Sequence, residues 1–197
     1  MSPTLLVLIR HAHTVSNDRR TACLSGRTDL PVSQRGRDEI LRLRRRLSGA
    51  PPFDAIYSSP LRRARETAAA LAEIGLGRVH VCGLLQEIDC GKLDGYPLEE
   101  VRSRFPNLWA ANLRQDDEHF RWPGGESYRE FRRRCLRAVE WLARTHPAGR
   151  IALVTHAGVV SQVLGYLAGA SPARWETCAL VRPRSPTWSG SQGAQVG

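Results

Sequence analysis

Residues 4–14 read Thr-Leu-Leu-Val-Leu-Ile-Arg-His-Ala-His-Thr, and this stretch sets the fold class. Its apolar run, Leu5–Ile9, is far too short to span a bilayer. The run also lacks the basic leader and the small-residue cleavage site of a signal peptide. We therefore expect a first strand over Thr4–Ile9, with Arg10 and His11 just past its carboxyl end.

Short apolar runs alternate with helical patterns along the chain, which is typical of an α/β domain with a largely parallel sheet. Further strands are expected at 53–57, 79–85, 151–155 and 178–181. Helices are expected at 33–47, at 60–70, at 127–145 and at 159–167. Ser33 is the expected N-cap of the first helix, and Ser59 with Pro60 is the expected start of the second.

The length of 197 residues is enough for one compact domain and short for two. We expect a single domain over residues 1–182, with an irregular insert at about 91–125 that serves as a lid. The last segment, 183–197, is rich in Pro, Ser, Gly and Gln and is expected to be disordered.

The five cysteines are scattered, odd in number and without C-x-x-C spacing. This pattern disfavours a disulfide framework or a zinc site and indicates a reducing cytoplasm as the compartment. The formal charge of +10 can serve nucleic acid, a membrane or an anionic substrate, or it can mark solvated helix faces. Because no nucleic-acid-binding motif accompanies the charge, we expect neither nucleic acid nor a membrane as a partner.

Polar side chains directly follow four of the predicted strands. In open α/β sheets ligands bind at the carboxyl edge, so groups from distant parts of the chain are expected to meet there. These groups are Arg10 with His11, Ser58 with Ser59, Glu87, and His156.

Each of these groups has both a chemical and a structural interpretation. A neutral His11 can accept phosphate and Arg10 can bind phosphate oxygens, but a histidine after a strand can equally be a structural hydrogen-bonding group. His156, followed by small residues, can face a bound oxyanion or can be a satisfied core histidine. Glu87 can protonate a departing alkoxide and then deprotonate water, with Asp89 as its rival, or it can be an exposed acid without a role.

The helix expected after Ser59 carries arginines in its first turn, so it is either an anion site or a charged surface helix.

Six segments of the chain form an ordered set of motifs. They are R-H-x-x-T (Arg10–Thr14) with Asn17, residues 25–31 with Gly36, S-x-L-x-R-A-x-x-T-A (Ser59–Ala68), Glu87 with Gly91 and Gly95, residues 123–127, and His156. Taken in this order, the motifs resemble those of the histidine phosphatase superfamily over roughly residues 4–168. The resemblance implies the phosphoglycerate mutase-like fold, a three-layer α/β sandwich with helices on both faces of a mostly parallel sheet.

The same resemblance implies roles for individual residues. His11 would be the nucleophile that carries the phosphate, and Glu87 would be the proton donor. Arg63, rather than Arg62, aligns with the phosphate-binding arginine of the family. The phosphate pocket would consist of Arg10, Arg63 and His156, with further contacts from Asn17, Ser25, Gly26 and the amide of Ala157. No metal and no cofactor are implied.

Two positions depart from the family pattern, which usually has Gly-Glu after the nucleophile where this chain has Ala12 and His13. The alanine is a small change, whereas His13 removes one negative charge beside the site. We also expect the pKa values of His11 and His156 to be separated, because the first must attack as a neutral ring while the second can donate to phosphate when protonated. Nearby arginines would favour the neutral form of His11.

The compact stretch from Glu87 to Pro123 resembles the small phosphatases, including the α-ribazole phosphatase type. The cofactor-dependent mutases of the family typically carry tyrosine at the position of Cys90, lysine at that of Leu98, and a longer insert. We therefore expect a phosphomonoesterase acting on a small phosphorylated metabolite, with a mutase as the alternative and a non-catalytic basic binding module as a third. Neither the substrate nor the oligomeric state follows from the sequence. In the insert, Trp109, Arg121 and Trp122 can contact a ligand, or the two tryptophans can instead form the core of the insert.

Overall fold

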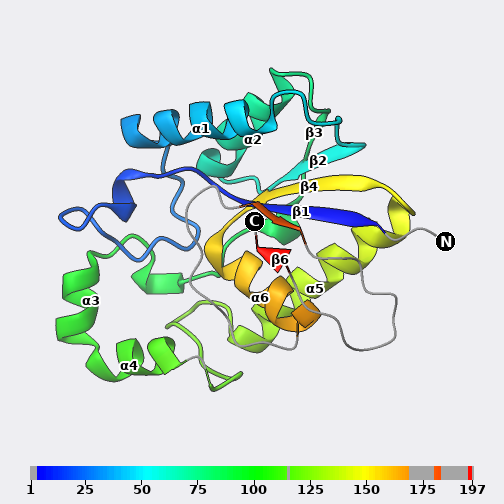
Figure 1. The fold of residues 1–197 in the computed structure, drawn as a ribbon. Coiled ribbons are helices and arrows are strands. Elements are labelled where there is room, and N and C mark those ends of the chain that lie inside the picture. Colours follow the sequence, from blue (N-terminus) through cyan, green and yellow to red (C-terminus); the bar gives the residue numbers. More distant parts are fainter. Residues whose placement is uncertain (1–3, 115, 169–179, 183–194, 197) are drawn as a thin grey trace.

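The computed structural model describes residues 4–114, 116–168, 180–182 and 195–196 (Figure 1). A six-stranded sheet with the order β3-β2-β4-β1-β5-β6 lies at its centre. The first four strands of this order run parallel, whereas β5 is antiparallel to β1 and β6 is antiparallel to β5. The strands are β1 (Leu5–Arg10), β2 (Ala55–Ser58), β3 (Val79–Val81), β4 (Arg150–Thr155), β5 (Leu180–Arg182) and β6 (Gln195–Val196).

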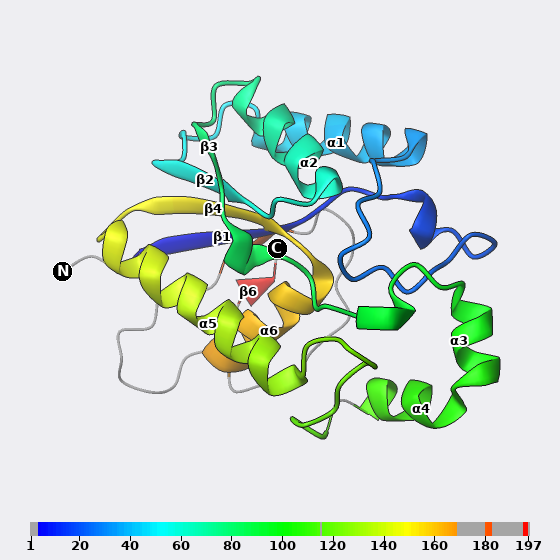
Figure 2. The ribbon, with the colours of Figure 1, turned by 180° about the vertical axis from the view of Figure 1, so that it is seen from behind.

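Helices cover both faces of the sheet. Helices α1 (Gln34–Leu47) and α2 (Arg62–Ala72) lie on one face, and α5 (Tyr128–Thr145) and α6 (Ala157–Ala168) lie on the other (Figures 1 and 2). The predicted three-layer α/β architecture with a mostly parallel sheet is therefore confirmed. The shorter elements are η1 (Val15–Asn17), η2 (Gly83–Leu85), η3 (Gly91–Leu93), α3 (Leu98–Arg104) and α4 (Pro106–Arg114).

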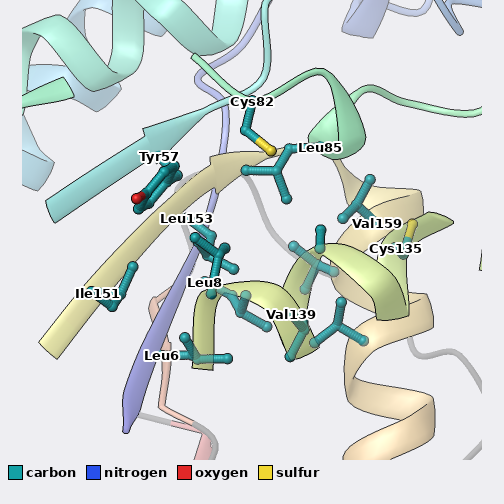
Figure 3. Packing of buried hydrophobic residues seen from close by; sticks show 14 of the residues in the cluster. Leu6, Leu8, Tyr57, Cys82, Leu85, Cys135, Val139, Ile151, Leu153 and Val159 are labelled. Atoms are coloured by element: carbon teal, nitrogen blue, oxygen red, sulfur yellow. The ribbon is translucent and has the colours of Figure 1, made fainter. Parts of the chain in front are cut away.

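Residues of the central strands alternate between the two faces, and this alternation builds two separate cores. Leu6 and Leu8 of β1 pack in the cluster formed with α5 and α6 (Figure 3). Val7 and Ile9 pack instead in the cluster formed with α1 and α2. Because both faces of a central parallel strand are buried, its sequence is a continuous apolar run without polar alternation. This explains why residues 5–9 are all apolar.

Helix α1 begins as its sequence predicts, because Ser33 Oγ accepts a hydrogen bond from the amide of Gly36 at 3.2 Å. The prediction for α2 was wrong by two residues: the helix begins at Arg62 and not at Pro60. Ser59 still belongs to the end of the sheet, since its amide donates to the Val154 carbonyl at 3.0 Å. The first helical amide, that of Arg62, donates to the distant carboxylate of Asp29 at 2.5 Å.

Other element boundaries also differ from the predictions. The strand expected at 79–85 ends at Val81, because the chain leaves the sheet and forms the 3-10 turn η2. Helix α6 begins at Ala157, two residues before the predicted start. Of the tail predicted to be disordered, Gln195 and Val196 pair with β5, so the prediction was wrong for these two residues. Residues 183–194 and 197, like the first part of the strand predicted at 178–181, lie outside the described residues.

Beyond the carboxyl ends of the parallel strands lies the segment of residues 91–125, which includes α3 and α4 (Figure 1). Its apolar side chains form a third cluster centred on Trp122, which is 1% exposed. Trp122 is thus part of the core of this segment and is not available for substrate contact. Trp109 packs at the edge of this cluster with the guanidinium of Arg102 above its ring. In the described part of the chain, no helix has the length and apolar character needed to cross a membrane.

Candidate active site

The sheet topology brings the predicted polar groups together. Strands β3, β2, β4 and β1 are neighbours and parallel, so their carboxyl ends lie along one edge. The amide of His11, just after β1, donates to the carbonyl of Thr155 at 2.8 Å. The rings of His11 and His156 consequently lie with their centroids 5.1 Å apart, although the residues come from opposite ends of the chain.

Two hydrogen bonds fix the proton of the His11 ring. Nδ1 lies 2.7 Å from the carbonyl oxygen of Ala12, and a carbonyl can only accept, so Nδ1 carries the proton. Nε2 lies 3.2 Å from Nε–H of Arg63 and accepts from it. The lone pair of Nε2 therefore faces the guanidinium, and His11 is held as the neutral tautomer that a nucleophile requires.

Burial and the positive charge of Arg63 lower the pKa of His11 from 6.5 to about 3. The hydrogen bond to Ala12 opposes this shift, while Arg10 and His13 add to it. The prediction that arginines favour the neutral form of His11 is thus confirmed, although burial contributes more than either arginine.

His156 is fully buried, and its Nε2 lies 2.8 Å from the hydroxyl oxygen of Ser59. Its Nδ1 is buried as well and has no hydrogen-bond partner among the described residues. Burial, followed by the proximity of His11 and Arg63, lowers the pKa of His156 well below 6.5. Both rings are thus shifted toward the neutral form, because both are buried next to the same cations, and the expected separation of the two pKa values stays a prediction.

Arg63, and not Arg62, lies beside His11. Besides its contact with His11, Arg63 donates from Nη1 to the Thr28 carbonyl at 2.7 Å and from Nη2 to the Gly26 carbonyl at 2.9 Å. These bonds hold the guanidinium in one orientation, and burial lowers the pKa of Arg63 although nearby carboxylates oppose that shift. Arg62 is instead exposed and pairs with Glu66 along the same helix, at 2.6 Å.

The loop that accepts from Arg63 is itself held by Asp94. The Asp94 carboxylate accepts from the amide of Gly26 at 3.0 Å, from the amide of Arg27 at 2.5 Å and from the hydroxyl of Thr28 at 2.6 Å. The amide and the carbonyl of Gly26 are therefore both used within the protein. A side chain at Gly26 would also be only 2.2 Å from the Ile88 carbonyl, which explains the glycine.

Glu87 lies at the N-terminus of α6. Its Oε2 accepts from the amide of Gly158 at 3.0 Å, and its Oε1 accepts from the amide of Ile88 at 3.0 Å. First-turn amides of a helix lack acceptors within the helix, so α6 offers a ready site for this carboxylate. A Cβ at position 158 would lie 2.3 Å from Oε1 of Glu87, so only glycine allows this approach.

The other predicted substrate contacts lie at the same edge but have different surroundings. Asn17 is exposed, and its side-chain oxygen accepts from the amide of Thr14 at 2.8 Å. The hydroxyl of Ser25 lies 3.3 Å from that of Ser16. Arg10 is the last residue of β1, and Ala157 is the first residue of α6. Of the candidate insert contacts, Arg121 donates to the Gly125 carbonyl and pairs with Glu130, each at 2.8 Å.

His13, which stands where the family usually has glutamate, is buried. Its Nδ1 lies 2.8 Å from the hydroxyl of Ser33, and its amide donates to the carboxylate of Glu39 at 2.9 Å. Its Nε2 lies 3.4 Å from a carboxylate oxygen of Asp18. The side chain at position 13 therefore holds the loop after β1 against α1, and carboxylates surround it even though it brings none.

Sequence reasoning missed three supporting residues. Thr67 accepts from the amide of Ala12 at 3.0 Å and donates to the Arg63 carbonyl at 2.7 Å, so it ties α2 to the loop that carries His11. Asp94 holds the loop at Gly26, and Arg134 holds the main chain of the segment that ends at Glu87. Thr67 lies in the quoted motif, but for the other two no local pattern marks the role, because their partners are main-chain atoms distant in sequence.

Cys23, Cys82, Cys90 and Cys135 are free thiols. Within the described ranges, no group of three or more His, Cys, Asp or Glu side chains is arranged to hold a metal ion.

The sequence pattern of the histidine phosphatase superfamily (branch 1) matches residues 6–189, which is most of the chain. The chain belongs to the histidine phosphatase superfamily. The motifs that place His11, Arg63, Glu87 and His156 at one edge are all within the matched region.

Known proteins similar to this histidine phosphatase include both mutase-like proteins and phosphatases. It is 31% identical over 156 residues to phosphoglycerate mutase-like protein 4 of Arabidopsis thaliana, which covers 79% of this chain and 67% of the relative. It is 28% identical over 171 residues to a metal-independent phosphoserine phosphatase of the same plant, covering 86% and 71%. A solved structure of phosphoglycerate mutase from Thermus thermophilus is 32% identical, with a TM-score of 0.73 and coverage of 98% and 96%. The predictions of the superfamily, its fold and a phosphatase-type enzyme are thus confirmed.

Proposed function

We propose that this enzyme is a phosphomonoesterase that hydrolyses a small phosphorylated metabolite through a phosphohistidine on Nε2 of His11. The observation that carries the proposal is the fixed neutral tautomer of His11, whose Nε2 lone pair lies 3.2 Å from Nε of Arg63. A neutral imidazole is nucleophilic, and the adjacent guanidinium can receive the phosphoryl oxygens as the ring attacks.

In the first step, Nε2 of His11 forms a bond to phosphorus while the ester P–O bond breaks. The leaving alkoxide takes a proton from the carboxylic acid of Glu87, so the alcohol departs neutral. In the second step, a water oxygen attacks phosphorus, Glu87 takes one of its protons, and the P–N bond breaks. The electron pair of that bond returns to Nε2, and phosphate leaves.

The phosphoryl transition state is anionic, so positioned cations and N–H donors provide most of the catalysis. We assign this role to Arg10, Arg63 and His156. His156 need not be charged to take part: if the Ser59 hydroxyl donates to Nε2, the proton of the neutral ring sits on Nδ1, which is buried and without a partner among the described residues. Further contacts are assigned to Asn17, Ser25 and the Ala157 amide, but not to Gly26 as the sequence predicted, because both of its main-chain groups already bond within the protein.

A hydrolase is favoured over a mutase because 86% of this chain is similar to a protein named as a phosphoserine phosphatase. The phosphoglycerate mutase of similar structure makes a mutase the second candidate. We place the enzyme in the cytoplasm, since its free thiols suit a reducing compartment.

A panel of phosphate esters tests the function. The purified protein is incubated with O-phosphoserine, 3-phosphoglycerate and sugar phosphates, and free phosphate is measured. We expect phosphate release without a metal or a cofactor. Isomerisation of 3-phosphoglycerate without phosphate release would replace the proposal by the mutase, and inactivity on every ester would favour a binding module.

Replacing His11 by alanine tests the intermediate. We expect His11→Ala to lose turnover and to give no acid-labile phosphate label, while its circular dichroism stays native. His119→Ala is the control, because the side chain of His119 is 72% exposed and lies outside the site. Normal turnover by the His11 variant would contradict the mechanism.

A further inference from the structure

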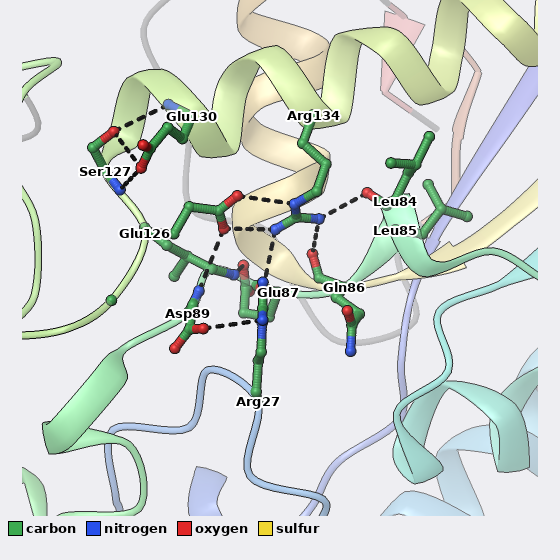
Figure 4. A network of polar contacts seen from close by, with 12 residues as sticks. Arg27, Leu84, Leu85, Gln86, Glu87, Asp89, Glu126, Ser127, Glu130 and Arg134 are labelled. Atoms are coloured by element: carbon green, nitrogen blue, oxygen red, sulfur yellow. Dashed lines mark hydrogen bonds and ion pairs between the residues drawn. The ribbon is translucent and has the colours of Figure 1, made fainter.

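Arg134 of α5 uses all of its donors close to Glu87 (Figure 4). A guanidinium has five N–H groups. Nη1 donates to the carbonyls of Leu84 and Gln86 at 2.8 and 2.9 Å, and Nη2 donates to the carbonyl of Glu87 at 3.3 Å. The two remaining N–H groups, one on Nε and one on Nη2, donate to the carboxylate of Glu126 at 3.0 and 2.8 Å. The side chain is therefore held in one position.

Glu126 extends this network to the other side of the Glu87 segment. Its amide donates to the carbonyl of Asp89 at 3.0 Å, and its carboxylate receives the Asp89 amide at 3.5 Å. The side chains of Arg134 and Glu126 are only 15% and 12% exposed. Water therefore competes little for their bidentate contact, which is the stronger geometry for such a pair.

The carbonyls that Arg134 binds lie where the chain has left the sheet. Strand β3 ends at Val81, so residues 84–87 have no neighbouring strand to receive their hydrogen bonds. Arg134 supplies three of the missing donors, and the last of them goes to the main chain of Glu87 itself. The carboxylate of Glu87 accepts two separate hydrogen bonds, from the amides of Gly158 and Ile88. Main chain and carboxylate are thus fixed independently.

We propose that Arg134, oriented by Glu126, is a positioning residue that sets the location of Glu87 for proton transfer to the leaving group. The inference rests on the role assigned to Glu87 under the proposed function. All of the hydrogen bonds from Arg134 to this segment go to main-chain carbonyls, those of residues 84, 86 and 87. Because a misplacement of about 1 Å can cost roughly a hundredfold in rate, removing the guanidinium should impair the steps that need the acid.

Leaving groups of different basicity separate this role from a general loss of structure. The value of kcat/KM reports the steps up to formation of the phosphohistidine. An alkyl ester such as glycerol 2-phosphate needs a proton on its departing oxygen, whereas 2,4-dinitrophenyl phosphate releases a stable anion. For Arg134→Met we expect kcat/KM to fall about 100-fold with the alkyl ester and less than about 3-fold with the dinitrophenyl ester.

Arg134→Lys and Glu126→Gln should show the same selectivity with smaller losses, because lysine cannot reach all three carbonyls and glutamine weakens the hold on the guanidinium. These two variants test the inference even if Arg134→Met does not fold. Arg133→Met is the matched control, because Arg133 is the exposed neighbour of Arg134 on α5. Its replacement should leave kcat/KM unchanged for both esters.

Glu87→Gln distinguishes the inference from the function on which it rests. If this variant lowers kcat/KM equally for the two esters, or leaves both values unchanged, the acid role of Glu87 is wrong. Suppose instead that Glu87→Gln lowers kcat/KM mainly for the alkyl ester. If the folded Arg134 and Glu126 variants then lower kcat/KM equally for the two esters, or leave both values unchanged, the positioning role of Arg134 is overturned and the acid role of Glu87 stands.

Discussion

Lowering the pH from 7 to 5 should reduce the free energy of unfolding through the buried ring of His11. In the unfolded chain this histidine has its ordinary pKa of 6.5, and at pH 5 it is almost fully protonated. In the folded protein its pKa is about 3, so the ring stays neutral. The unfolded state therefore binds more protons over this range, and stability rises with pH. The contribution of His11 is complete above pH 6.5 and is lost progressively as the pH falls toward 3.

Integrating the difference in bound protons from pH 7 to pH 5 gives about 2 kcal/mol for a single histidine with this shift. His156 contributes with the same sign, because its pKa is also lowered by burial. Urea unfolding at pH 7 and pH 5 measures the effect in the wild type and in His11→Asn. Titrating groups far from His11 affect both proteins alike, so the difference between the two reports the ring of His11 together with its interaction with His156.

We expect the wild type to lose about 2 kcal/mol more than His11→Asn between the two pH values. His119→Asn is the control and should follow the wild type, because this side chain is 72% exposed. A gap between wild type and His11→Asn that stays constant to within about 0.5 kcal/mol would refute the reasoning, since His11 would then gain its proton in the folded protein as easily as in the unfolded one.

Two further predictions concern single positions. Gly158→Ala would place a Cβ 2.3 Å from Oε1 of Glu87, so kcat/KM for alkyl phosphates should fall at least about tenfold, while Gly83→Ala, where nothing lies within 4 Å, should be unaffected. Leu142→Ala should lower the free energy of unfolding by about 2–5 kcal/mol in urea titrations, because Leu142 is fully buried. Leu113→Ala, at a position 57% exposed, should change it by less than about 0.5 kcal/mol, and equal losses in the two leucine variants would contradict the assignment of the core.

The sequence predicts much of the fold because the relevant signals are local. A continuous apolar run marks a strand that is buried on both faces, as in β1. Ser33 caps α1 through its side chain, which accepts from the amide of Gly36, only three residues further along the chain. The start of α2 was missed because its first amide is satisfied by Asp29, a residue more than thirty positions away. A local pattern cannot show a cap that comes from another part of the chain.

The same distinction applies to the candidate site. Its reactive side chains follow strand ends, so the topology rule places them together before any coordinates are known. The groups that hold them bind main-chain atoms: Asp94 holds the loop that accepts from Arg63, and Arg134 holds the segment that carries Glu87. Because every residue has a main-chain carbonyl, the identity of the partner residues does not reveal these contacts in the sequence. The burial that lowers the pKa of both His11 and His156 is likewise a property of the assembled packing, which residue type alone does not show.

The pairing of β1 with β4 also constrains how this protein folds while it is being synthesised on the ribosome. Leu5 pairs with Arg150 and Arg10 pairs with Thr155, so β1, the strand that ends just before His11, is synthesised long before its neighbour β4. Until β4 emerges, the apolar segment 5–9 lacks the strand that lies between β1 and β2 in the finished sheet, and contacts so distant in sequence form slowly. An unpaired apolar strand is prone to aggregation. By the same constraint, the candidate site is incomplete until β4 and His156 have been synthesised.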